Sequence, residues 1–365
     1  MVSVSIFILS FLLTILIIIG LHEFGHFIAA RLLGVRVLRF SIGFGRVLFS
    51  KFDQTGTEYA LSAIPLGGYV KLLGEEAGEK VPKAYQAFTF HHQAFWKKFI
   101  IIAAGPLVNF VLALFLYWLI FMIGFTSVLP VIGKVTPHSI AAEAGLLPKQ
   151  EIIQIDHTPV SSWMSVVIRI LSHTGNRDTL IVTTRSSLGM TQEHILNLTT
   201  WKMDNLNPDP IGSLGIEVYA PKSGTLPPHM LHHNQYGPVQ AFSHAWQNTR
   251  DFIWLNFDFI LKLITGKVSL QSLGGPISIF STAGAALHEG LVAFMSFLAF
   301  LSIAIGIINI LPIPGLDGGH LLFQCIERVI GRPIPDRIML IAYRLGIVFI
   351  ILLSIQAIFN DIMRL

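Results

Sequence analysis

Four segments of the chain are long and apolar enough to cross a membrane as helices. A spanning helix needs about 20 predominantly apolar residues, and each segment meets that length. The first has a polar interruption, in which His22, Glu23 and His26 fall among apolar residues. We predict spanning helices at approximately Val4–Ala30, Phe99–Phe125, Leu291–Leu311 and Ile338–Phe359.

The loop after the first span has a pattern that favours strands. Its two runs, Val35–Phe44 and Tyr59–Lys71, contain β-branched and aromatic residues and have glycine-rich turns beside them. We therefore predict a β-hairpin or small sheet that lies against the membrane.

The segment from residue 126 to residue 290 differs from the spans. Residues 130–220 mix short apolar runs with turn residues, which is typical of an α+β domain. A Pro- and His-rich linker, Pro221–Pro238, follows, and Val239–Ile264 has the amphipathic pattern of a helix at a membrane interface. Within the domain we predict strands at Glu151–Ile155, Thr179–Thr184 and His194–Thr199, and helices at Ala141–Leu146 and near Trp163–His173.

Composition supports a multi-span membrane protein and narrows the kinds of site that it can hold. Hydrophobic residues make up 53% of the chain and charged residues 13%, whereas soluble domains have about 25% charged residues. With one cysteine, Cys325, neither an intrachain disulfide nor a cysteine-based zinc cluster can form. The sequence has no arginine-rich stripe with interleaved aromatic residues, so we expect no nucleic-acid partner.

Charge predicts the orientation in the membrane. The loop from Arg31 to Lys98 has 10 Lys and Arg against 5 acidic residues, and no Lys or Arg precedes Arg31. By the positive-inside rule this loop is cytoplasmic, so both termini and residues 126–290 lie outside. The missing basic region also argues against a cleaved signal peptide, and we expect the first span to be retained.

The polar cluster in the first span has the form of a zinc-binding motif. Residues 22–26 read His-Glu-Phe-Gly-His, and residues four apart share one face of a helix, so both imidazoles can bind one zinc ion. Glu23 is positioned to accept a proton from the attacking water and to pass it to the leaving amine. The alternative is a buried His–Glu pair that joins helices, although ionisable residues inside a span are functional by default.

A catalytic zinc also needs a third protein ligand. Asp317, just past the third span, is the best candidate. The first and third spans run in the same direction, and His22 lies about 27 Å along the first at 1.5 Å per residue, so His22 and Asp317 are expected at similar depth. Asp317 could otherwise be a helix N-cap or turn residue, and His320 is a weaker candidate ligand. The pairs His91-His92 and His232-His233 are expected to be solvated.

Two motifs together resemble those of the site-2 protease family of intramembrane metalloproteases. They are His22-Glu-Phe-Gly-His26 and Asn309-Ile-Leu-Pro-Ile-Pro-Gly-Leu-Asp-Gly-Gly-His320. The likeness is closest to the bacterial branch that acts in sigma-E signalling, and it covers nearly the whole chain. It implies one zinc ion bound by His22, His26 and Asp317, with Glu23 as the catalytic base, and it suggests that Asn309 handles substrate. Supporting stretches are residues 39–45, 64–71, 104–109 (Ala-Gly-Pro-Leu-Val-Asn), 274–278 and 359–361.

The outer domain resembles a PDZ domain in residues 131–135, 139–146 and 151–160. About 90 residues are available, so we expect one such domain rather than the tandem pair of some relatives. The resemblance implies that substrates are single-span proteins, such as an anti-sigma factor, that another extracytoplasmic protease has already trimmed. Remnant signal peptides are a further substrate class, and the PDZ domain would act as a gate or docking site.

The sequence thus predicts a polytopic α-helical membrane protein of the bacterial inner membrane, with four transmembrane helices, a membrane-associated β-hairpin and one extracytoplasmic α+β PDZ domain. The expected parts are a membrane core (1–125 and 291–365), the PDZ domain (126–222) and a linker with an interfacial helix (223–290). The expected activity is regulated intramembrane proteolysis. The rivals are an inactive metal-binding PDZ scaffold, disfavoured by the intact Glu23, and a metal-ion transporter, disfavoured by the almost wholly apolar second and third spans.

Overall fold

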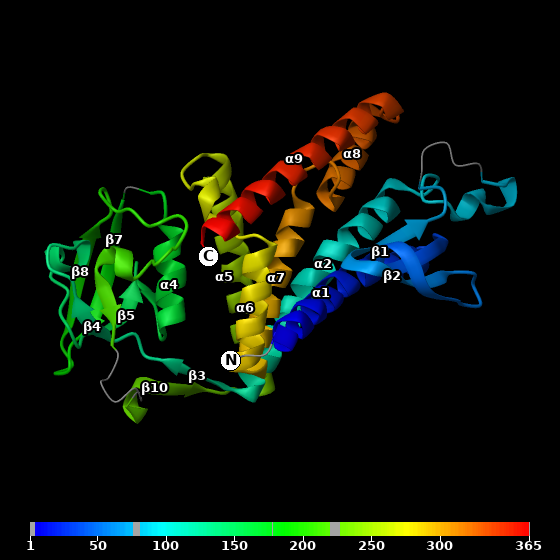
Figure 1. The fold of residues 1–365 in the computed structure, drawn as a ribbon. Helices are drawn as coiled ribbons and strands as arrows, with labels where there is room; N and C mark the ends of the chain where they lie inside the picture. Colours follow the sequence, from blue (N-terminus) through cyan, green and yellow to red (C-terminus); the bar gives the residue numbers. More distant parts are fainter. Residues whose placement is uncertain (1–3, 76–80, 177, 220–226, 365) are drawn as a thin grey trace. The chain divides into compact units, whose positions relative to one another are not determined.

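The computed structural model describes residues 4–75, 81–176, 178–219 and 227–364. Contacts divide the chain into two compact units, and each is described by itself (Figure 1). The first unit comprises Met1–Tyr117 and Pro276–Ile355, and the second comprises Trp118–Gly275 and Gln356–Leu365.

Among the described residues, four helices are long and apolar enough to cross a membrane, and they coincide with the four predicted spans. Their ends differ by a few residues from the prediction, and the second helix begins at Phe95 rather than Phe99. Lys97 therefore lies in the first turn of that helix, where its Nζ donates to the Leu33 carbonyl at 3.0 Å. The four helices are α1 (Val4–Leu32), α2 (Phe95–Ile123), α7 (Leu291–Ile310) and α9 (Asp336–Met363).

The predicted hairpin is present, with β1 (Val37–Phe52) antiparallel to β2 (Glu58–Leu72). β1 does not end at Phe44 as expected, because Gly43 and Gly45 adopt φ angles of +92° and +81°. Glycine reaches this region without a Cβ clash, so the strand bends and then pairs again instead of stopping. The hairpin lies beside α1 in Figure 1, and a shared apolar core holds the two together; its members include Phe27, Ala30, Val37, Leu72 and Ile101.

Two helices of the first unit were not predicted. α6 (Pro276–Glu289) is rich in small residues, and its Gly284 lies directly against the Phe7 ring of α1. α8 (Asp317–Ile330) lies in what the sequence suggests is a loop, and it ends at Gly331 in a left-handed conformation with φ of +74°. Both are too short to span a bilayer, so a search for long apolar runs passes over them.

The second unit contains the predicted α+β domain. Its sheet has the strand order β6-β5-β7-β8, all neighbours antiparallel, and a separate pair joins β4 to β9. Fully buried apolar side chains from the strands and from α4 form one core, which includes Ile132, Ile152, Val166, Leu180 and Leu196. The elements are β4 (Ile132–Val135), α3 (Ile140–Glu143), β5 (Glu151–Ile155), β6 (Thr158–Pro159), α4 (Trp163–Ser172), β7 (Thr179–Arg185), β8 (Thr191–Asn197) and β9 (Ile216–Val218).

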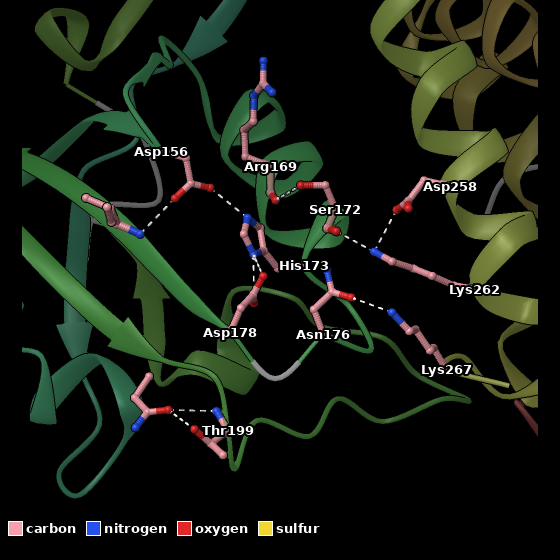
Figure 2. Close-up of polar contacts among 12 residues, drawn as sticks. Asp156, Arg169, Ser172, His173, Asn176, Asp178, Thr199, Asp258, Lys262 and Lys267 are labelled. Carbon is pink, nitrogen blue, oxygen red and sulfur yellow. Dashed lines mark hydrogen bonds and ion pairs between the residues drawn. The ribbon is translucent and has the colours of Figure 1, made fainter. Parts of the chain in front are cut away.

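The predicted amphipathic helix is α5 (Pro238–Ile264), and it joins the α+β domain through polar contacts. Figure 2 shows Lys262 of α5 between two partners: its Nζ pairs with Asp258 Oδ2 at 2.7 Å and donates to the Ser172 carbonyl at the end of α4. His173, which caps α4, lies between two carboxylates, with Nε2 2.8 Å from Asp156 and Nδ1 3.1 Å from Asp178 (Figure 2). These contacts tie the end of α4 to both its own sheet and α5.

The predicted linker Pro221–Pro238 is only partly a linker. Residues 220–226 lie outside the described residues, but β10 (Leu231–Asn234) pairs antiparallel with β3 (Phe125–Val128). His232 and His233 lie on β10 and are exposed, as expected. The prediction of an irregular segment was therefore wrong for residues 231–234, because strand pairing depends on a partner more than 100 residues away.

Candidate active site

Two helices bring three candidate metal ligands to one point. His22 and His26 lie four residues apart on one face of α1, and Asp317 is the first residue of α8. Oδ2 of Asp317 lies 3.1 Å from Nε2 of His22 and 3.3 Å from Nε2 of His26, and the two Nε2 atoms are 3.3 Å apart. Within the described part of the chain, these three residues form the one group with metal-ligand geometry.

The spacing of the three atoms fits a tetrahedral zinc ion. With zinc–ligand bonds of about 2.0–2.1 Å, the edge of the tetrahedron is about 3.3 Å, close to all three observed distances. Oδ2 of Asp317 is buried, with the Nε2 atoms of His22 and His26 as close polar neighbours. Burial opposes ionisation of Asp317, but the neighbouring imidazoles of His22 and His26 outweigh it and hold its pKa below the ordinary value. The carboxylate is thus in the ionised form that binds a metal.

Glycines allow the backbone to approach the metal-ligand cluster. A methyl group on Gly105 of α2 would lie 2.2 Å from Nε2 of His26, and one on Gly25 would lie 2.6 Å from the Ala104 carbonyl oxygen. The start of α8 is equally tight, since a methyl group on Gly318 would lie 2.1 Å from the Leu311 carbonyl oxygen. Only glycine fits at these positions without movement of the backbone or of a ligand.

Each histidine has a second polar neighbour on its other ring nitrogen. Nδ1 of His26 lies 2.8 Å from the Ile101 carbonyl oxygen, which can only accept, so the Nδ1 atom donates and Nε2 faces Asp317. Nδ1 of His22 lies 3.3 Å from the carboxamide of Asn109 on α2. Sequence reasoning assigned no role to Asn109, although a fully buried amide inside an apolar span is a signal of function.

Glu23 lies between the metal-ligand cluster and the hairpin. It lines the same cavity as His22, His26 and Asp317. A methyl group on Gly68 of β2 would lie 2.9 Å from Cγ of Glu23, so β2 passes directly over this carboxylate. The cavity has a volume of about 460 Å³, and its walls come from α1, α2, β2, α8 and α9.

His320, the weaker ligand candidate, lines the cavity but does not belong to the metal-ligand group. Its Nδ1 lies 3.0 Å from the Tyr343 hydroxyl. Burial lowers the pKa of His320, with the charge of Asp317 opposing this effect, so the ring is neutral at pH 7. His320 is therefore arranged as a hydrogen-bonding neighbour of the site.

Two other predicted residues lie in unexpected places. Asn309 is half-buried near the end of α7, and it is not one of the described residues that line the cavity. His91, expected to be solvated, is exposed yet also lines the cavity. Neighbouring His92 is bound to Thr89, with 2.8 Å between Nδ1 and Oγ1.

Comparison with known proteins finds a protein family and relatives that match nearly the full length of the chain. The family model described as Peptidase family M50 matches residues 10–353. A Vibrio cholerae protein named as a zinc metalloprotease is 34% identical over 445 residues, with 98% of each chain covered. The regulator of sigma-E protease RseP of Escherichia coli K12 is 34% identical over 442 residues, and the regulator of sigma E protease of Haemophilus influenzae is 32% identical over 436 residues, each with 98% of both chains covered.

The family match, the identity to these relatives and the four apolar helices agree with one another. They also agree with a sequence in which the zinc-type motif lies inside a span. The chain belongs to peptidase family M50, the site-2 protease family, and is a membrane-embedded zinc metalloprotease.

Proposed function

We propose that His22, His26 and Asp317 are the zinc ligands and that Glu23 is the catalytic base. The observation that carries this proposal is the set of ligand-atom distances, 3.1, 3.3 and 3.3 Å, beside a carboxylate in the same cavity. A zinc ion held by these three residues would keep one coordination position free for water or substrate, as a hydrolytic site requires. The cavity that surrounds them supplies the space for water and substrate.

Zinc bound there would polarise the scissile carbonyl and lower the pKa of a coordinated water to about 7. The Glu23 carboxylate takes one proton from the attacking water as the new C–O bond forms. It returns that proton to the amide nitrogen as the C–N bond breaks, so the products are a carboxylate and an amine. β2 packs against the Glu23 side chain, since a methyl group on Gly68 would lie 2.9 Å from its Cγ atom, and both residues line the cavity.

A transmembrane substrate must unwind before cleavage, because a helix hides its carbonyl groups in hydrogen bonds. β2 offers a place for the extended segment, since Gly68, Tyr69 and Val70 line the cavity. An added strand along this part of the hairpin would satisfy the substrate backbone and bring one carbonyl group toward Asp317. Asn309 is proposed to contact substrate further along α7.

The substrate class comes from the relatives. Several are named as regulators of sigma E, and they match 98% of this chain. We propose that this protease cleaves single-span anti-sigma-type proteins, after another extracytoplasmic protease has trimmed them, and also remnant signal peptides. The α+β domain is proposed to be a single PDZ domain that gates or docks them. The alignments run over more positions than the 365 residues of this chain, which fits a shorter outer region here than in those relatives.

The proposed setting is the bacterial inner membrane, with both termini and the PDZ domain in the periplasm. The excess of Lys and Arg between the first two spans supports a cytoplasmic hairpin. α5 is proposed to lie at the membrane interface, since Trp246 and Trp254 are exposed on it and tryptophan favours that region.

The decisive experiment uses detergent-purified full-length protein, wild type and Glu23→Gln, with a tagged single-span anti-sigma-type substrate and a zinc assay. We expect cleavage by wild type, loss of cleavage in Glu23→Gln and after chelation, and about one zinc per chain in both proteins. Zinc without cleavage in wild type would favour the inactive scaffold. No zinc in either protein would contradict the ligand set.

A further inference from the structure

We propose that Asn109 is a positioning residue for the metal site. Its carboxamide oxygen accepts a hydrogen bond from Nδ1 of His22 and so holds that imidazole in the tautomer that can bind zinc. This inference rests on the proposed ligand set, and it assigns a role to a residue that the set itself does not use.

The orientation of the His22 ring requires a hydrogen-bond acceptor beside its Nδ1 atom. Its Nε2 faces the site, 3.1 Å from Asp317 Oδ2, so Nδ1 points away from it. A neutral imidazole that binds a metal through Nε2 carries its proton on Nδ1 and must donate that proton to an acceptor. The group opposite Nδ1 is the Asn109 carboxamide, whose Nδ2 lies 3.3 Å away.

A carboxamide can present either its oxygen or its nitrogen, because a 180° rotation exchanges the two atoms. With nitrogen toward His22, Oδ1 of Asn109 is buried without a hydrogen-bond partner among the described residues. Rotation transfers the unpaired position to the nitrogen and leaves the number of hydrogen bonds unchanged, so the metal decides between the two. A nitrogen toward His22 would need a lone pair on Nδ1 and a proton on Nε2, and that proton would block the ligand atom.

Asn109 lies in a tightly packed position opposite His22. Its side chain is 0% exposed, and its backbone carbonyl accepts a hydrogen bond from Ser302 Oγ of α7 at 2.8 Å. Gly306 of α7 lies against its Cβ, since a methyl group on residue 306 would be 3.3 Å from that atom. The amide thus lies between α1 and α7 with no room to turn away. Burying a polar amide in the middle of an apolar span costs free energy, so such a residue is expected to have a function.

The second histidine provides the comparison. His26 donates its Nδ1 proton to the Ile101 carbonyl at 2.8 Å, so it has the same tautomer through a backbone partner. No substitution removes a backbone carbonyl, but a substitution can remove the Asn109 oxygen. Loss of such a second partner commonly lowers metal affinity about 10–100-fold.

The test compares three variants of the full-length protein in detergent. Asn109→Leu has a similar shape and no acceptor, Asn109→Asp restores an acceptor oxygen, and Ser302→Ala removes the neighbouring hydrogen bond without touching His22. Zinc dissociation constants are measured by competition with a chromophoric chelator, and thermal unfolding of the zinc-free proteins reports on folding. We expect Asn109→Leu to bind zinc about 10–100-fold more weakly, and Asn109→Asp and Ser302→Ala to bind it within about threefold of wild type.

The inference would be overturned if Asn109→Leu bound zinc as tightly as the wild type. It would also be overturned if Asn109→Leu and Asn109→Asp lost the same amount of zinc affinity. If Asn109→Leu does not fold, Asn109→Ala gives the same reading with a smaller side chain. A wild-type protein without zinc affinity would overturn the ligand set as well, so the two failures are distinguishable.

Discussion

The backbone of Gly105 and the imidazole of His26 lie in direct contact, with no space for a side chain between them. A methyl group on residue 105 would be 2.2 Å from Nε2 of His26, the atom that faces Asp317. The Ala-Gly-Pro stretch of α2 is therefore part of the wall of the metal site.

Gly105→Ala is expected to displace the His26 ring and to lower zinc affinity by at least about tenfold, as loss of ligand orientation does. Zinc content of the purified variant measures this effect. Gly20→Ala on α1 is the matched control, because a methyl group there meets nothing within 4 Å. Full zinc occupancy in Gly105→Ala at wild-type affinity would show that the ring has room to move.

Gly68→Ala is expected to reduce cleavage while zinc remains bound. Its methyl group would lie 2.9 Å from Cγ of Glu23 and 2.7 Å from the Ser41 carbonyl oxygen, so either the strand or the carboxylate must shift. A misplacement of about 1 Å can cost about 100-fold in rate. Initial rates with a saturating substrate measure the loss.

Gly67→Ala serves as the neighbouring comparison for Gly68→Ala. Its methyl group would meet the half-exposed Phe44 ring rather than the carboxylate. A ring at the surface can turn aside, so Gly67→Ala should cleave at close to the wild-type rate. Equal losses in the two variants would point to a general distortion of the hairpin.

Asp317→Asn and His320→Gln separate the proposed third ligand from its neighbour. Asp317→Asn removes the charge that faces both imidazoles, so we expect zinc content to fall well below one per chain. His320→Gln should keep its zinc, because His320 contacts the Tyr343 hydroxyl and lies outside the metal-ligand group. Atomic absorption measures the zinc content of both variants. If His320→Gln lost its zinc and Asp317→Asn kept it, His320 rather than Asp317 would be the third ligand.

The β1–β2 turn is expected to loosen between about pH 4 and pH 2. Hydrogen bonds from Thr55 and Thr57, with Arg31 nearby, lower the pKa of Asp53 from 3.8 to about 2. A lowered carboxyl pKa means that its contribution to stability is full above pH 3.8 and is lost as pH falls toward 2. Pepsin, which is active in this range, should cut the turn progressively faster as pH falls.

Asp53→Asn provides the control for the pH dependence of the turn. It has no titrating carboxyl, so its cutting rate should follow the activity of the protease alone. The hydrogen bonds that Asp53 Oδ1 accepts from Thr55 and Thr57, at 2.8 and 3.0 Å from the backbone nitrogens, are the contacts at stake. Parallel pH profiles for the two proteins would mean that Asp53 does not stabilise the turn.

The amino-acid sequence by itself determined the parts of this protein that depend on local pattern. Long apolar runs require helices in a membrane, because every backbone group must be paired within its own segment. β-Branched and aromatic runs beside glycine-rich turns in the first loop indicated the hairpin, and the spacing of His22 and His26 placed two imidazoles on one helix face. The motif at residues 22–26 together with the motif at residues 309–320 indicated the metalloprotease family, which the comparisons confirm.

Only the tertiary structure decided which residues from different elements lie together. Asn109, Gly105 and Gly68 give no periodic signal, and their importance comes from what faces them across a helix or strand contact. β10 and α8 were missed for a related reason, since a short strand or helix is stabilised by its packing partner more than by its own residues. Local pattern determines which secondary structure each segment forms. Close packing between segments determines the ångström-scale geometry on which metal binding depends.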